Sequence, residues 1–293
     1  MPTTTANDID LCYESFGPDD APPLLLVMGL GAQMTLWSPG FISELLERGF
    51  RVIRFDNRDA GLSTKSDAPP PDVMAVYAQA LAGQPVESPY TLSTMAADAV
   101  GLLDALDIPA AHLVGASMGG MIVQMMAIEH PDRVLSMTSI MSTTGAGDVG
   151  QPDAAAMTAL LTPPPTDRAG AIDATVATSR VIGGSLFDEA EARARAAEAY
   201  DRCFHPAGTA FQIAAVAATG DRTERLRSVE VPTLVVHGRE DPLVTLSGGE
   251  ATAASVPGAD LLVFGLMGHD LPPLYWSQMA DAIFGVAVRA ESY

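Results

Sequence analysis

The most informative segment of the chain is residues 112–120, which read H-L-V-G-A-S-M-G-G and contain the motif G-x-S-x-G. The apolar run 112–114 predicts a short buried strand, and the apolar spacing of 118–129 predicts a helix directly after it. A serine on such a sharp turn projects above the sheet, and the glycines that flank it leave space for a strained backbone. The motif also fits a plain strand-to-helix turn, so Ser117 is interpreted as a nucleophile only together with the partners described below.

Strands and helices alternate around this segment. Strands are predicted at 7–17, 24–28, 50–55, 112–114, 134–141, 232–236 and 260–264, and helices at 39–48, 92–106, 118–129 and 275–286. This alternation is typical of an α/β protein with a parallel sheet covered by helices on both faces.

One long segment interrupts this alternation. Glycines and prolines follow residue 143, and three helical patterns then occur without a strand between them, at 167–182, 188–204 and 208–219. We therefore predict a core made of 1–144 and 229–293, with an inserted helical cap at 145–228.

A serine hydroxyl needs a base that removes its proton. His269 lies in a glycine-flanked loop just after the last predicted strand, and loops at the carboxyl ends of parallel strands converge. The other four histidines lie within a strand, at a helix end, in the cap and at the end of a strand: His112, His130, His205 and His237. His269 is therefore the predicted general base, with a structural loop histidine as the alternative.

The acid of a triad is expected after the preceding strand, where Glu240 and Asp241 compete. Asp241 precedes a proline, which holds its backbone extended, so we favour it. The chain order Ser117, Asp241, His269 is that of α/β hydrolases and differs from the other known triad orders.

An oxyanion formed at the serine needs backbone N–H donors. Met118 at the start of the helix can supply one, and the loop Gly29-Leu30-Gly31 can supply another through Leu30. A simple glycine turn is the alternative for that loop. It does not match a dinucleotide-binding loop, because Met34 stands where the third glycine would be.

Apolar residues near these loops are candidates for a substrate-binding site. The predicted lining is Gly29, Met34, Trp37, Phe187, Phe204 and Phe211, with core packing as the alternative for the cap aromatics.

Charge and cysteine content restrict the partners and the compartment. The formal charge is −20, with 36 acidic and 16 basic residues, which opposes binding to nucleic acid and to anionic lipid. Cys12 and Cys203 are far apart and fit a reducing compartment. The first residues lack a secretory pattern and no segment resembles a membrane span, so a cytoplasmic protein is expected. The sequence leaves the oligomeric state open, a homodimer included.

Together these residues resemble the α/β-hydrolase superfamily over nearly the whole chain. Residues 56–63, D-N-R-D-A-G-L-S, are similar to its Asp-x-Arg-Gly-x-Gly-x-Ser segment. Residues 26–29 and 52–59 are most similar to actinobacterial carboxylesterases of the LipG type and to aclacinomycin methylesterases. The resemblance implies an eight-stranded sheet and hydrolysis of a carboxylic ester through an acyl-enzyme, without a metal or an organic cofactor. The chain departs from the pattern at Met28 and Asp59, where many members have His and Gly.

Two groups of alternative functions remain at this stage. The same triad could act on a lactone, thioester, amide or carbon–carbon bond of a small molecule, or catalyse perhydrolysis. A ligand-binding protein with slow turnover is the alternative from a different class.

Overall fold

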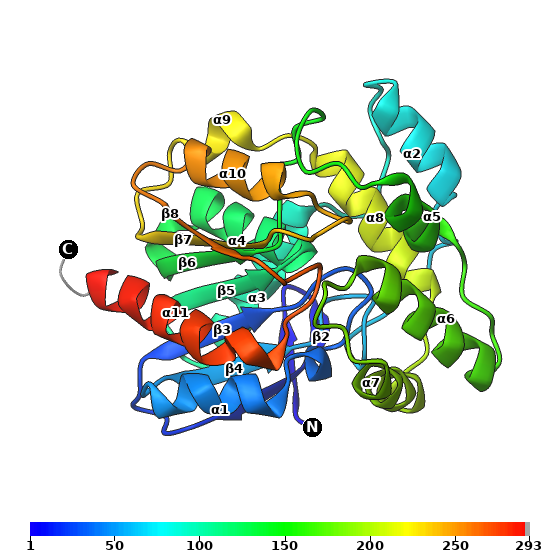
Figure 1. Cartoon of the computed structure of the whole chain (residues 1–293). Helices are drawn as coiled ribbons and strands as arrows, with labels where there is room; N and C mark the ends of the chain where they lie inside the picture. The colour runs from blue at the N-terminus through cyan, green and yellow to red at the C-terminus, as the bar shows by residue number, and fades with distance from the viewer. Residues whose placement is uncertain (291–293) are drawn as a thin grey trace.

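The sheet organises the chain, and the computed structural model describes it within residues 1–290. Its eight strands lie in the order β1-β2-β4-β3-β5-β6-β7-β8 (Figure 1). Only the pairings of β2 with β1 and β4 are antiparallel. The strand bounds are β1 Thr3–Ala6, β2 Ile9–Phe16, β3 Pro23–Val27, β4 Arg51–Phe55, β5 Ala111–Ala116, β6 Val134–Ile140, β7 Thr233–Gly238 and β8 Asp260–Phe264.

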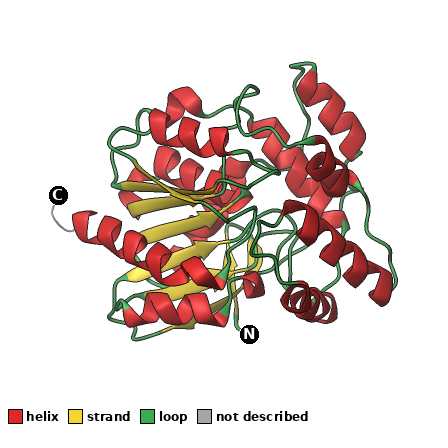
Figure 2. Ribbon diagram, in the orientation of Figure 1, coloured by secondary structure: helices red, strands yellow, loops and turns green. Residues whose placement is uncertain are grey.

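Helices cover both faces of this sheet, as Figure 2 shows. Successive side chains of a strand point to opposite faces of the sheet. In β3, Leu24 and Leu26 belong to the hydrophobic cluster on the first face, and Leu25 and Val27 belong to the cluster on the second face. The first face packs against α1 (Pro39–Glu47) and α11 (Trp276–Ala290), and the second against α3 (Leu92–Ala105) and α4 (Met118–Glu129).

Four helices between β6 and β7 form a separate layer, which lies in Figure 1 beyond the carboxyl ends of the parallel strands. Their bounds are α5 Ala154–Leu161, α6 Arg168–Ile182, α7 Glu189–Arg202 and α8 Ala207–Thr219. The layer has a small buried cluster of its own, formed by Ile172, Val176 and Ala196. Helix α8 instead contributes Phe211 and Ala215 to the main core.

The remaining helices are short or lie at the edges of the fold. They are η1 Met34–Leu36, α2 Val73–Leu81, η2 Pro131–Arg133, α9 Thr223–Leu226, α10 Leu246–Ser255 and η3 Pro273–Tyr275. Helix α9 packs against α4 and α10, which flank the sheet. Within residues 1–290, none of the helices combines the length and the apolar character needed to cross a membrane.

The α/β class and the sheet are confirmed, with one error in the first strand. The prediction of a single strand over 7–17 is wrong, because Asn7 and Asp8 have φ of 49° and 64° and form the tight turn of a hairpin between β1 and β2. Positive φ at both central residues is typical of hairpin turns, and the Asn-Asp pair was the available signal. Helices α2, α5, α9 and α10 were not predicted from the sequence. The last three residues of the predicted core, 291–293, lie outside the described part of the chain.

Candidate active site

Ser117 occupies a strained turn between β5 and α4. Its φ is +56° and its ψ −119°, a region that L-residues rarely adopt. The flanking glycines are required by space, because a Cβ on Gly115 would lie 2.1 Å from the Gly119 carbonyl oxygen, and one on Gly119 would lie 2.0 Å from that of Val27. The Ser117 N–H donates to the Ile140 carbonyl over 2.9 Å, which anchors the turn to β6. The turn predicted from the sequence is thus present.

Ser117, His269 and Asp241 form a continuous hydrogen-bonded chain. The Nε2 atom of His269 lies 2.9 Å from Ser117 Oγ, and its Nδ1 lies 2.7 Å from Asp241 Oδ2. The three residues follow β5, β7 and β8, whose carboxyl ends lie at the same edge of the sheet. The Asp241 carboxylate is buried and the His269 ring is 7% exposed, so water screens this relay weakly.

The two competing carboxylates point to different partners. Asp241 Oδ1 accepts hydrogen bonds from the N–H groups of Leu243 and Val244, each over 2.9 Å, which leaves Oδ2 for the imidazole. Glu240 instead accepts from the N–H and the hydroxyl of Ser185, in the loop after α6. The geometry therefore joins Asp241, and not Glu240, to His269.

A second histidine lies beside the acid. His237 is fully buried, and its Nε2 donates to the Val244 carbonyl over 2.7 Å and lies 3.6 Å from Asp241 Oδ2. Burial lowers the pKa of His237, so the ring is neutral and supports the Asp241 turn without adding charge. The sequence indicated only that this histidine ends a strand, since a spacing of four residues outside a helix does not predict that two side chains meet.

The loop of His269 is attached to the inserted helices. The His269 N–H donates to the Ile182 carbonyl at the end of α6 over 2.7 Å. The neighbouring Asp270 accepts from the N–H groups of Gly184 and Gly268. Burial raises the pKa of Asp270. The end of α6 therefore helps to fix the position of the imidazole.

The predicted oxyanion loop lies against the nucleophile. A Cβ on Gly29 would lie 3.1 Å from Ser117 Cβ, so only a glycine fits comfortably there. The next residues turn back, with the Ala32 N–H donating to the Gly29 carbonyl and Gly31 at a φ of +65°. Neither the Leu30 nor the Met118 N–H donates to an acceptor within residues 1–290.

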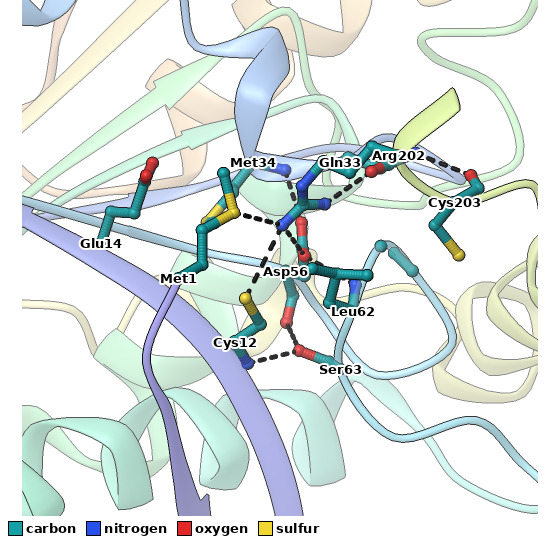
Figure 3. A network of polar contacts seen from close by, with 12 residues as sticks. Met1, Cys12, Glu14, Gln33, Met34, Asp56, Leu62, Ser63, Arg202 and Cys203 are labelled. Atoms are coloured by element: carbon teal, nitrogen blue, oxygen red, sulfur yellow. Dashed lines mark hydrogen bonds and ion pairs between the residues drawn. The ribbon is translucent and has the colours of Figure 1, made fainter. Parts of the chain in front are cut away.

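A network of polar contacts connects the loop after β3 to the end of α7 (Figure 3). Arg202, at the end of α7, donates to Asp56 over 2.7 Å and to the side-chain oxygen of Gln33 over 2.5 Å. Asp56, which is fully buried after β4, also accepts from the Met34 N–H over 2.8 Å. On the other side, Asn57 donates to the Met28 carbonyl. The loop is therefore held both by the segment after β4 and by the inserted helices.

The predicted substrate-lining residues are divided by the structure into two groups. Trp37 and Met34 are fully buried, Phe211 is 1% exposed, and all three pack within the protein interior. Trp37 stacks on Phe41, and Phe211 joins the main core. These three placements fit core packing, because such side chains offer almost no surface to a ligand.

Phe187 and Phe204, two of the other predicted lining residues, are half-buried and retain exposed surface. Phe187 lies under the Arg180 guanidinium beside α6, and Phe204 packs on the Tyr200 ring. Gly29 is buried and lies beside Ser117, as described above.

The departures from the family pattern are accommodated locally. Asp59 has a φ of +64°, the backbone conformation that glycine adopts easily, and its carboxylate accepts from Tyr90 and from both donors of Ser66. These bonds offset the backbone strain. Met28 is buried, and it contributes its carbonyl oxygen to Asn57.

The fold and the Ser–His–Asp arrangement define an α/β hydrolase. The sequence profile described as alpha/beta hydrolase fold matches residues 22–273, and the chain belongs to this family.

Two named hydrolases are similar to this chain over most of their length. Rhodomycin D methylesterase DnrP of Streptomyces peucetius is 29% identical over 311 residues, covering 97% of each chain. 3-Oxoadipate enol-lactonase 2 of Acinetobacter baylyi is 28% identical, covering 85% of this chain and 82% of the other. The crystal structure of the enol-lactonase from Burkholderia xenovorans LB400 superposes with a TM-score of 0.72 at 23% identity over all of both chains, which agrees with the fold.

Proposed function

We propose that this α/β hydrolase cleaves a carboxylic ester with Ser117 as nucleophile, His269 as general base and Asp241 as the acid that orients the imidazole. The observation that carries the proposal is the unbroken relay of 2.9 Å and 2.7 Å that ends on a serine at positive φ. The similarity to methylesterases over 97% of the chain supports an ester as the substrate.

The reaction proceeds in two halves. His269 Nε2 accepts the Ser117 proton while Oγ forms a bond to the ester carbonyl carbon, and the carbonyl electron pair moves to the oxygen. The tetrahedral intermediate collapses as the imidazolium protonates the leaving alcohol. Water then attacks the acyl-enzyme with His269 as base, and its proton returns to Ser117 Oγ as the acid departs. Asp241 keeps the tautomer that leaves Nε2 free as an acceptor.

The negative charge of the intermediate requires donors that are already in place. The N–H groups of Leu30 and Met118 are the proposed oxyanion hole, since the Gly29 turn lies against Ser117 and Met118 begins α4. Loss of such a donor reduces kcat by about a hundred- to a thousand-fold.

The proposed substrate is a small or medium apolar ester that binds under the inserted helices. Residues 145–228 act as a cap, with α9 at its boundary with the core, and Phe187, Phe204 and Gly29 are the proposed contacts. A lactone is the second candidate bond, favoured by the similarity to enol-lactonases. We further propose a cytoplasmic enzyme without nucleic-acid partners and without a metal or organic cofactor.

A substrate panel tests the proposal. Short p-nitrophenyl esters, aromatic methyl esters and simple lactones are assayed with the wild type and with Ser117→Ala. We expect ester turnover that falls by roughly a million-fold in the variant, the loss seen when a triad serine is removed. Lactone turnover that exceeds ester turnover would favour the second candidate. A folded wild type that turns over no ester and no lactone, and whose Ser117 does not react with a fluorophosphonate, would refute the proposal.

A further inference from the structure

Gln212 on α8 connects the inserted helices to the oxyanion loop. Its side chain is fully buried and makes two hydrogen bonds, both to backbone groups. Its Oε1 accepts from the Gly31 N–H over 2.7 Å, and its Nε2 donates to the Arg58 carbonyl over 2.8 Å. The amide thus bridges two loops that follow different strands, β3 and β4.

The partners dictate the orientation of this amide. The Gly31 N–H can only donate and the Arg58 carbonyl can only accept, so a reversed amide would place like groups together at both ends. Helix α8 also packs closely on the turn, because a Cβ on Gly31 would lie 2.6 Å from the Thr209 hydroxyl oxygen. Gln212 therefore holds the two loops together through one accepted and one donated hydrogen bond, and replacing it removes the side-chain partner of both backbone groups.

The Gly31 N–H, which donates to Gln212, belongs to the central peptide of the turn Gly29–Ala32, and the orientation of this peptide sets the type of the turn. In the turn Gly29–Ala32, Leu30 has a negative φ and Gly31 a φ of +65°, the pattern of a type II turn. Type I and type II turns differ by a flip of the central peptide, here the one between Leu30 and Gly31. A flip would turn the Leu30 carbonyl toward Gln212 Oε1 and replace a hydrogen bond by a contact between two acceptors. Gln212 therefore selects the type II form.

We propose that Gln212 is a positioning residue for the oxyanion hole: by holding the Gly31 peptide it fixes the backbone of Leu30, whose N–H is one of the two donors. This inference rests on the proposed hydrolytic function. A donor contributes to the rate only when it is held where the charge develops, and a misplacement of about 1 Å can cost about a hundred-fold. Helix α8 thus takes part in the chemistry without touching the substrate.

The first test is Gln212→Met, which keeps the length of the side chain and removes both hydrogen bonds. We expect kcat for an ester to fall by about ten- to a hundred-fold, with KM changed by less than about threefold, because the turn contributes mainly in the transition state. The inhibition constant of a trifluoromethyl ketone, which forms an oxyanion on Ser117, should rise by the same factor as kcat/KM falls.

Gln124→Met is the matched control. Gln124 is also fully buried and bonds to Ser139 and Arg222, away from the oxyanion loop. It should lower the denaturation midpoint while keeping kcat within about threefold of the wild type, since folded molecules retain the intact turn. Equal kcat losses in the two variants, or a folded Gln212→Met enzyme with unchanged kcat and ketone affinity, would overturn the proposal.

Gln212→Glu provides a second test of the proposal if the methionine variant does not fold. A protonated glutamic acid reproduces both bonds, and burial raises the pKa of such a carboxyl. The ratio of its kcat to that of the wild type should be near one at the acidic end of the activity range and fall as pH rises. A ratio below one that does not change with pH would count against Gln212.

A fluorophosphonate probe separates the role of Gln212 from the choice of substrate. If the wild type reacts with fluorophosphonate but turns over no ester, the proposed ester substrate is wrong, while Ser117 remains the nucleophile. The rate of Ser117 phosphonylation in Gln212→Met then still reports on the oxyanion hole, because the phosphoryl oxygen needs the same donors. An unchanged phosphonylation rate would overturn the inference alone.

Discussion

The sheet core and the inserted layer α5–α8 are stabilised in different ways. Helix α4 in the core is buried over almost its whole length, whereas α7 buries a single alanine, Ala196. The inserted layer carries exposed ion pairs such as Arg193 with Asp173. Exposed pairs contribute little to stability, and apolar burial contributes much more. The layer therefore depends on its attachments to the core.

Those attachments end on the catalytic loops. Ile182 accepts from the His269 N–H, Arg202 binds Asp56, and Gln212 binds Gly31. The inserted layer is thus attached to the core at residues that contact the loops of His269 and Leu30. Variants that change either the core or the inserted layer can test whether the two regions are stabilised differently.

The largest expected effect concerns the two adjacent carboxylates. Asp241→Asn should lower kcat by about 10⁴-fold, because the amide no longer enforces the productive tautomer of His269. Glu240→Gln, which affects only the attachment to Ser185, should keep kcat within about tenfold, since such a hydrogen bond contributes about 0.5–1.5 kcal/mol. Steady-state kinetics of both variants provide the measurement. Comparable losses of kcat in the two variants would contradict the different roles of Asp241, which orients the imidazole, and Glu240, which only attaches the inserted layer.

The second effect concerns the buried ion pair between the regions. Arg202→Met leaves Asp56 buried with only backbone donors, and we expect a loss of about 3 kcal/mol in the free energy of unfolding. The control Arg193→Met removes a half-exposed pair and should shift the urea midpoint only slightly. Adding Asp56→Asn to Arg202→Met should recover part of the loss. Equal effects of the two arginine variants would show that the inserted layer does not depend on this attachment.

The smallest effect is a pH dependence located in the core. Burial lowers the pKa of His112 from 6.5 to about 4, so the folded state binds fewer protons than the unfolded state between these values. The free energy of unfolding should therefore fall as pH drops from about 6.5 to about 4. His112→Asn, which retains a polar group for Ser136, should flatten this slope in urea titrations. An identical slope in the variant would assign the effect to other groups, such as His237.

The sequence was most informative for elements whose ends are marked by neighbouring residues in the chain. The helix at 118–129 and the strand at 260–264 were predicted with the observed bounds, because the helix lies between the G-x-S-x-G turn and Pro131, and Gly258 and Gly265 flank the strand. Helix α10 was missed because two glycines weaken its pattern, and α2 because its apolar residues do not follow one face. The prediction of Trp37 and Phe211 as lining residues fits the structure poorly, because an aromatic side chain looks the same in a core and in a pocket.

The chain by itself determined the α/β class, the turn that carries Ser117 and the order of the three residues of the relay, because these depend on neighbours in the sequence. Only the tertiary structure decided that Asp241 rather than Glu240 faces the imidazole and that Gln212 binds the oxyanion loop. Gln212 lies 181 residues from Gly31, and a contact across that separation leaves no local pattern. It exists because the packing of α8 against the core brings a buried amide to a backbone group that needs a partner.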